Sequence, residues 1–162
     1  MLTGGKSAQA LKLLKAFQGD QVVLADYGDI PAFSSSNYQL ISLGERNEET
    51  IAHNLLSTCL DLGVERLLPL CRFELEAVVK SAVLFEEFNI HVLLPDMEVF
   101  AQYPVTGEQN SGHWAVYDRG ALLFSTFQAE AAAAAGIARQ LNGAFYLVEN
   151  GPVLHPVLFT IA

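Results

Sequence analysis

The stretch 65–96, ERLLPLCRFELEAVVKSAVLFEEFNIHVLLPD, constrains the fold more than any other part of the chain. Its pattern predicts a buried strand over Arg66–Leu70, a loop over Cys71–Phe73, an amphipathic helix over Glu74–Phe88 and a second buried strand over Ile90–Leu94. A strand, a crossover helix and a strand form a parallel unit, and helices cover both faces of a parallel sheet. The stretch therefore predicts an α/β fold.

The residues before this stretch continue the same alternation of strands and helices. Strands are predicted over Met1–Thr3, Gln21–Ala25 and Tyr38–Leu43, a helix over Ser7–Gln18, and a second helix with Asn47 as its N-cap and Gly63 as its end. Crossovers between parallel strands are right-handed in nearly all sheets. We therefore expect residues 1–95 to form a Rossmann-like domain with a parallel sheet.

The character of the sequence changes after Pro95. A loop is predicted over 104–112, followed by a hairpin around Asp118-Arg119-Gly120, an alanine-rich helix over Gln128–Leu141 and a second hairpin around Asn150-Gly151. Pro152 and Pro156 restrict the last strand, Val153–Ile161, to a sheet edge or break it in two. Residues 96–162 are therefore predicted to form a small antiparallel α+β segment with four strands and one helix.

The charge of the chain excludes several classes of partner. The 162 residues carry a net charge of −9, and nine Lys and Arg stand against 18 Asp and Glu. An acidic chain without a basic stripe is a poor ligand for nucleic acids or anionic membranes, and the chain has no apolar run of about 20 residues. We expect a cytoplasmic protein in which Cys59 and Cys71 are core thiols, with no metal site.

The first candidate site is the turn formed by Gly4, Gly5, Lys6 and Ser7. Two glycines let a ligand approach the backbone, and the helix that follows presents free N–H groups to an anion. The turn matches neither the P-loop nor the GxGxxG pattern, although Asp26 lies where a ribose-binding acid would be expected. The alternative is a tight turn with a solvated lysine.

The second candidate site is Cys71-Arg72-Phe73-Glu74. If the strand order is 3-2-1-4-5, this segment and the Gly4–Ser7 turn flank the crevice where such sheets bind ligands. Arg72 and Lys6 would then form a cationic mouth suited to a carboxylate or a phosphate. The alternative is that Glu74 caps its helix while Arg72 pairs with a surface acid. The spacing of the His and Ser residues predicts no catalytic residue.

Several segments resemble a known family of enzymes. VVLADYGDIPAFSSSNYQLISL, EETIAHNLLSTCLDLGV, ERLLPLCRFELEAVV and FEEFNIHVLLPD look like the pre-ATP-grasp domain of carbamoyl-phosphate-synthase-like ATP-grasp ligases. IARQLNGAFYLVENGPVLHPVLFTI is similar to the last helix and hairpin of the ATP-grasp catalytic domain. There the family places acidic and amide ligands for Mg²⁺, whereas this chain has AFYLV and LFTI, and it has no lysine after Lys80 for the nucleotide.

This resemblance implies that the chain is a relative of these ligases whose catalytic region is truncated. It leads us to expect a non-catalytic ATP-grasp-like protein that binds a small anionic molecule or a protein partner at the crevice. No cofactor is expected, because ATP and Mg²⁺ would bind only if a partner supplied the missing residues. Two alternatives remain. One is a subunit of an ATP-dependent carboxylate–amine or carbamoyl-phosphate-synthase-like ligase, completed by a ligase partner or a homodimer; the other is a dinucleotide-binding Rossmann protein that uses Asp26.

Overall fold

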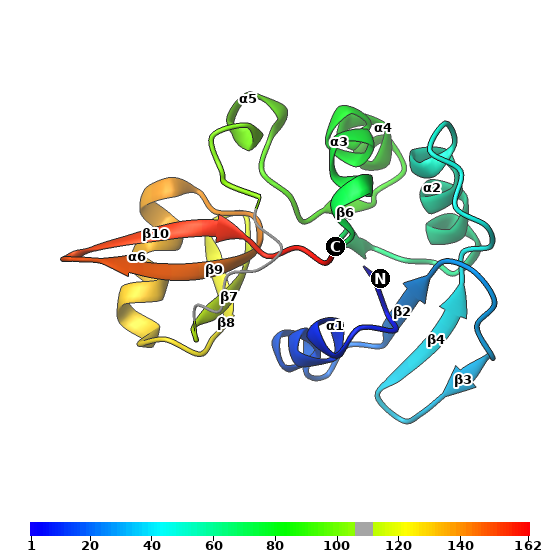
Figure 1. The fold of residues 1–162 in the computed structure, drawn as a ribbon, viewed down its shortest axis with the longest axis horizontal. Helices are drawn as coiled ribbons and strands as arrows, with labels where there is room; N and C mark the ends of the chain where they lie inside the picture. Colours follow the sequence, from blue (N-terminus) through cyan, green and yellow to red (C-terminus); the bar gives the residue numbers. More distant parts are fainter. Residues whose placement is uncertain (106–111) are drawn as a thin grey trace.

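A computed structural model describes residues 1–105 and 112–162 and shows a mixed α/β fold with parallel and antiparallel sheets (Figure 1). The loop predicted over 104–112 falls mostly outside these ranges. In chain order the elements are β1 (Leu2–Thr3), α1 (Ala8–Leu13), the 3-10 helix η1 (Leu14–Phe17), β2 (Val22–Asp26), β3 (Phe33–Ser34), β4 (Tyr38–Ser42), α2 (Ile51–Asp61), β5 (Arg66–Leu67), α3 (Arg72–Lys80), α4 (Ala82–Glu87), β6 (His91–Val92), α5 (Met97–Phe100), β7 (Trp114–Asp118), β8 (Ala121–Ser125), α6 (Ala129–Arg139), β9 (Gly143–Asn150) and β10 (Val153–Leu158).

The first part of the chain forms parallel strand pairs. β1 pairs with β2, β2 with β4, and β5 with β6, all in parallel, while the short strand β3 runs antiparallel beside β4. A parallel bridge joins Leu2 to Leu68, immediately after β5, and the Thr3 amide donates to the Leu68 carbonyl at 3.2 Å. β1 therefore lies between β2 and the chain that leaves β5.

The second part forms the predicted antiparallel sheet of four strands and one helix. The strand order is β10-β9-β7-β8, and α6 packs beside β8. Arg119 and Gly120 close the β7–β8 hairpin with φ angles of 48° and 84°, the left-handed values that a two-residue hairpin turn requires. β10 lies at the sheet edge, as Pro156 within it demands.

The prediction of one helix over Glu74–Phe88 is wrong. The segment forms α3 and α4, which are separated at Ser81 with φ −102° and ψ 4°. The break redirects the second half of the segment, so that Phe85 is completely buried while Val83 stays 74% exposed. Since α3 already begins at Arg72, the predicted loop is also shorter than expected.

The N-cap assigned to Asn47 is also wrong. The helix α2 begins at Ile51 with Thr50 as its N-cap, and Asn47 instead forms the turn that precedes the helix. Its side-chain oxygen accepts from the Glu49 amide at 3.0 Å, and its carbonyl accepts from the Thr50 amide at 3.1 Å. An asparagine forms such local turns as readily as helix caps, because both use the same short side-chain hydrogen bond.

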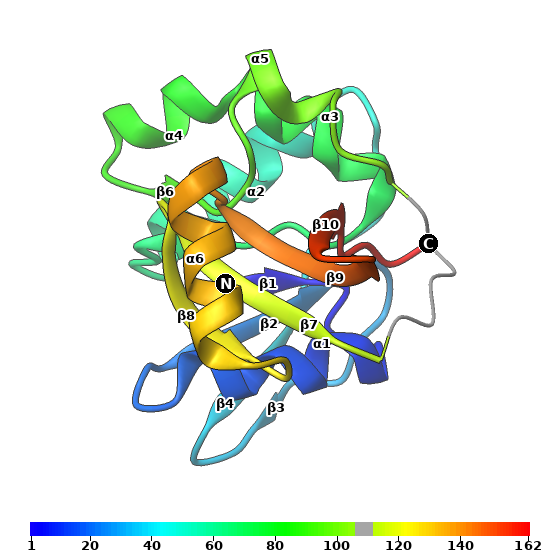
Figure 2. The same ribbon diagram turned by 90° about the vertical axis from the view of Figure 1, so that its left-hand side faces the viewer.

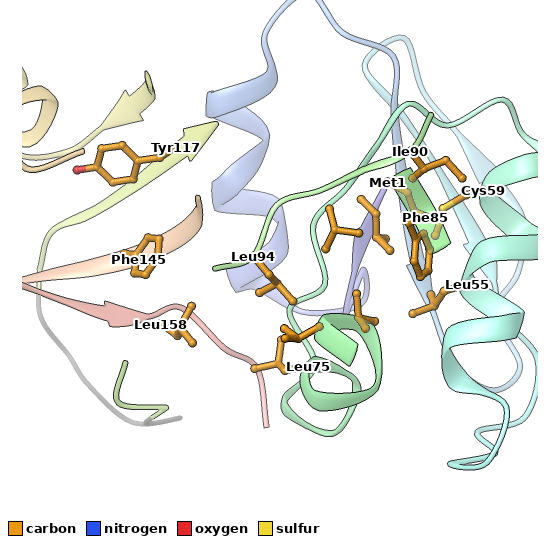
Figure 3. Close-up of a cluster of buried hydrophobic side chains, with 14 of the residues drawn as sticks. Met1, Leu55, Cys59, Leu75, Phe85, Ile90, Leu94, Tyr117, Phe145 and Leu158 are labelled. Atoms are coloured by element: carbon orange, nitrogen blue, oxygen red, sulfur yellow. The ribbon is translucent and has the colours of Figure 1, made fainter. Parts of the chain in front are cut away.

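Helices flank the sheets on two sides, with α2, α3, α4 and α5 on one side and α1 on the other (Figure 2). Two clusters of buried side chains fill the space between the layers, and each draws residues from both sides of Pro95. Leu55 and Leu75 share one cluster with Tyr117 and Phe145, as Figure 3 shows. The parallel strands and the antiparallel sheet are therefore joined through common cores. Within the described ranges, no helix is long and apolar enough to cross a membrane.

Candidate functional site

A crevice of about 450 Å³ lies at the carboxyl ends of the parallel strands. The segments that follow β1, β2, β4 and β5 contribute its walls, and the chain after β10 closes one side. Its lining residues are Gly4, Lys6, Ser7, Asp26, Tyr27, Arg46, Cys71, Phe73, Ile161 and Ala162. The structure thus brings the Gly4–Ser7 turn, Asp26 and the Cys71–Glu74 segment to one place. Ligands bind at this end of open α/β sheets, because the loops that follow the strands meet there.

The two glycines of the turn make room for the protein itself. A Cβ atom on Gly4, whose φ is 69°, would lie 2.7 Å from Cδ1 of Ile161, and one on Gly5 would lie 2.9 Å from Cβ of Leu24. Two amides of the turn are also occupied: that of Gly5 donates to the Ala25 carbonyl at 3.0 Å, and that of Ser7 to the Gly4 carbonyl at 2.9 Å. These two N–H groups therefore bind within the chain.

Asp26 takes the place that an external anion would have at this turn. Its Oδ2 accepts from the Lys6 amide at 2.9 Å, and its Oδ1 accepts from the Tyr27 amide at 2.8 Å. The Lys6 ammonium donates to the Tyr27 carbonyl at 2.8 Å and lies 3.9 Å from Oδ1 of Asp26. Both groups are consequently held by neighbours within the chain, and both carboxylate oxygens of Asp26 accept from backbone amides.

The second cation at the crevice is Arg46. Its guanidinium lies 3.6 Å above the centre of the Phe73 ring, and the Phe73 ring meets the Tyr27 ring edge-on at 5.3 Å. Arg46 also pairs with Glu48 on the solvent side. Arg72, by contrast, begins α3 with an exposed side chain and does not line the crevice. The structure thus brings Lys6 together with Arg46 and not with Arg72.

A signal for Arg46 was present in the sequence. The segment that contains it follows the predicted strand Tyr38–Leu43, and parallel strands end at the same edge of a sheet. Asp26 lies opposite Ser42 in the register of β2 and β4, so the loop after β4 leaves the sheet beside the crevice. Sequence reasoning missed Arg46 because it considered only the loops on either side of the switch point.

Glu74 lies behind the crevice and is completely buried. It belongs to the first turn of α3, whose N-cap is Cys71, so it does not cap the helix as one alternative proposed. Thr3 Oγ1 donates to Glu74 Oε2 at 2.5 Å and accepts from the Leu70 amide at 2.7 Å. Burial raises the pKa of Glu74 to about 7, although its interactions with Thr3 and Tyr27 oppose part of that rise.

Tyr27 connects this buried carboxyl group to the crevice. Burial, and then the nearby Glu74, raise the pKa of the Tyr27 phenol well above its usual range. Among the described residues, however, neither the Tyr27 hydroxyl nor Oε1 of Glu74 has a partner with good hydrogen-bond geometry. The two groups lie close enough to interact electrostatically. Burial also raises the pKa of the Cys71 thiol to about 12, which keeps it protonated and unreactive.

The chain after β10 runs as an extended segment from the antiparallel sheet toward the parallel strands (Figure 1). The Ile161 amide donates to the Leu70 carbonyl at 2.7 Å, and the Arg72 amide donates to the Ile161 carbonyl at 2.9 Å. These bonds place Ile161 in a parallel bridge with Cys71, and its side chain packs over Gly4. The end of the predicted last strand therefore leaves the antiparallel sheet and becomes a wall of the crevice.

A second hollow of about 480 Å³ lies at the opposite, amino ends of the strands. The segment Ser34–Asn37 and an ion pair between Arg66 Nη2 and Asp20 Oδ2, 2.5 Å apart, contribute to its walls. Sequence reasoning did not anticipate it. We assign the candidate site to the carboxyl-end crevice instead, because that crevice has the expected position and Glu74, a buried carboxyl group with a raised pKa, lies behind it.

Across the described ranges, no group of three or more His, Cys, Asp or Glu side chains is arranged to hold a metal ion. Comparison with protein-family models, with curated proteins and with solved structures found no match to this chain.

Proposed function

We propose that this chain is a non-catalytic, ATP-grasp-like binding protein whose Rossmann-like sheet holds a small anionic ligand in the carboxyl-end crevice. The observation that carries the proposal is that two cations, Lys6 and Arg46, line one crevice in a chain of net charge −9. The position of β1 between β2 and the chain that leaves β5 supports the Rossmann-like assignment, because the order in which successive strands are added reverses at that point.

Arg46 is the group best suited to recognise the anion. A guanidinium is a planar fork that binds a carboxylate or phosphate through two parallel hydrogen bonds. Stacking on Phe73 restricts the orientation of this fork before a ligand arrives, which lowers the entropic cost of binding. Lys6 contributes less, because Asp26 and the Tyr27 carbonyl already hold its ammonium group.

The groups around the crevice favour binding over chemistry. The Cys71 thiol has a pKa of about 12 and is therefore a poor nucleophile at neutral pH. Glu74 does not line the crevice, so its carboxyl group lies out of contact with a bound molecule. A proton-transfer role would require such contact, since general bases act at hydrogen-bond distance.

A titration with sulfate and acetate, followed by NMR shifts of the crevice amides, tests the proposal. We expect both anions to bind the wild type at about 10 mM or below, and Arg46→Gln to weaken binding by about tenfold. Arg72→Gln is the matched control, because its side chain is exposed and lies outside the crevice. An equal loss in both variants would reject the assignment to Arg46, and absence of binding to the wild type would reject the proposal.

A further inference from the structure

Glu74 is a buried titratable group that the proposed function does not use. It is 0% exposed, and its closest hydrogen-bond partner, Thr3, lies 71 residues away in the sequence. We propose, on the basis of the proposed function, that Glu74 makes anion binding proton-dependent: the crevice binds its anion when the Glu74 carboxyl group is protonated and releases it when that group ionises.

The geometry connects Glu74 to the crevice through one side chain. Tyr27 lines the crevice, while its hydroxyl is buried and interacts electrostatically with Glu74. Within the described part of the chain, neither the Tyr27 hydroxyl nor Oε1 of Glu74 has a hydrogen-bond partner. A protonated Glu74 donates a hydrogen bond to a phenol oxygen, whereas an ionised one accepts from the phenol proton. A change in protonation therefore reaches the wall that the ligand contacts.

The charges that face Glu74 make its ionisation unfavourable for an anion. Thr3 approaches from β1, Tyr27 and Asp26 from the end of β2, and the Cys71 backbone and thiol from the start of α3. Asp26 is the only ion in this set, and it repels an ionised Glu74. No ion pair of the described residues involves Glu74. Its charge would therefore act on the crevice without a neutralising partner.

A count of charges around the crevice gives the direction of the effect. Among the side chains that line the crevice, Lys6 and Arg46 stand against Asp26, so these side chains carry an excess of one positive charge while Glu74 is neutral. Ionisation of Glu74 cancels that excess. Glu48 pairs with Arg46 from the solvent side whether Glu74 is neutral or ionised, so it does not alter the change in charge between these two states. Burial raises the pKa of Glu74 to about 7, which places the change close to neutral pH.

The test measures sulfate and acetate binding at about pH 6 and about pH 8, because both anions keep a constant charge between these values. We expect the wild type to bind about fivefold more weakly at the higher pH, the effect of one partly screened charge a short distance away. Glu74→Gln should bind equally at both values. Glu76→Gln, an exposed change in the same helix, should keep the wild-type dependence.

A second measurement uses only the wild type, in case Glu74→Gln fails to fold. Because coupling between two sites is reciprocal, saturating sulfate should move the NMR titration midpoint of the Glu74 carboxyl carbon upward by about 0.7 pH for a fivefold effect. An unmoved midpoint, or an equal pH dependence in wild type and Glu74→Gln, overturns the inference and leaves the proposed function intact. Absence of binding in every variant and at both values overturns both.

Discussion

At the scale of single residues, Glu74 has an uncommon environment. A carboxyl group without exposure and without a cationic partner is costly to ionise, because burial removes the water that stabilises its charge. Thr3 compensates in part, since its hydroxyl donates to Glu74 and accepts from the Leu70 amide. Through its hydrogen bond with Thr3, Glu74 joins β1 to α3, and its ionisation makes the folded state sensitive to pH.

We expect Glu74 to make folding less favourable as pH rises. Its pKa is about 7 in the folded chain against an ordinary value of 4.5, so the folded state binds the proton more tightly. The free energy of unfolding should therefore fall by about 3 kcal/mol in total as pH rises between these two pKa values, and it should level off above pH 7. Denaturant unfolding of wild type and Glu74→Gln across that interval measures the effect.

The variant isolates Glu74 because all other titrating groups are common to both proteins. The difference in unfolding free energy between wild type and variant should change across the interval and remain constant above it. A constant difference at every pH would show that Glu74 ionises equally in the folded and unfolded chain.

At the scale of elements, the loop between α6 and β9 joins the β5–β6 pair to the antiparallel sheet. Asn142 Nδ2 donates to the Val92 carbonyl at 3.1 Å and to the Leu94 carbonyl at 2.8 Å, while its Oδ1 accepts from the Arg119 amide at 3.2 Å. One side chain thus forms hydrogen bonds with the carbonyl of Val92 in β6, the carbonyl of Leu94 just after it and the amide of Arg119 in the β7–β8 turn. Gly143 adds close packing, since a Cβ there would lie 2.7 Å from the Leu93 carbonyl oxygen.

Asn142→Asp should weaken this junction although it preserves the shape of the side chain. The carboxylate still accepts from the Arg119 amide, but it has no proton to donate to the Val92 and Leu94 carbonyls. We expect the free energy of unfolding to fall by about 2 kcal/mol, the sum expected for two lost hydrogen bonds. Chemical denaturation measures the loss. Wild-type stability in this variant would mean that the two bonds contribute nothing to the junction.

At the scale of the whole molecule, the shared cores predict one cooperative unit. Leu55 and Leu75 come from helices that flank the parallel strands, and they belong to the same cluster as Tyr117 and Phe145 of the antiparallel sheet. The extended segment at Ile161 adds backbone hydrogen bonds between the two parts. Neither part can unfold without exposing the apolar surface of the other.

Leu55→Ala tests this cooperativity. Leu55 is completely buried in α2, so the cavity should cost about 3 kcal/mol. Trp114 is the only tryptophan and lies in β7, so its fluorescence reports on the antiparallel sheet. We expect the midpoint from fluorescence to fall as far as the midpoint from far-ultraviolet circular dichroism. The exposed Leu84→Ala is the control, and a fluorescence midpoint that stays unchanged would contradict the shared core.

Local features of the sequence determined much of the secondary structure. Residues that adopt positive φ account for the hairpins around Arg119 and Gly151 and for the left-handed Asn89. Pro156, which has no backbone N–H, accounts for the edge position of β10. Short continuous apolar runs indicated the parallel strands. These predictions hold because each depends on the conformational preferences of a few adjacent residues, which the rest of the chain does not override.

Only the tertiary structure decided the site. It ended α3 at Ser81, placed Arg46 rather than Arg72 at the crevice, filled the glycine turn with Asp26 and buried Glu74 against Thr3. Each of the last two contacts joins residues 20 or 71 positions apart. No local pattern encodes such distances, because they depend on how completed elements pack. The physical reason is that a local pattern specifies conformation, whereas burial and charge depend on the neighbours that packing supplies.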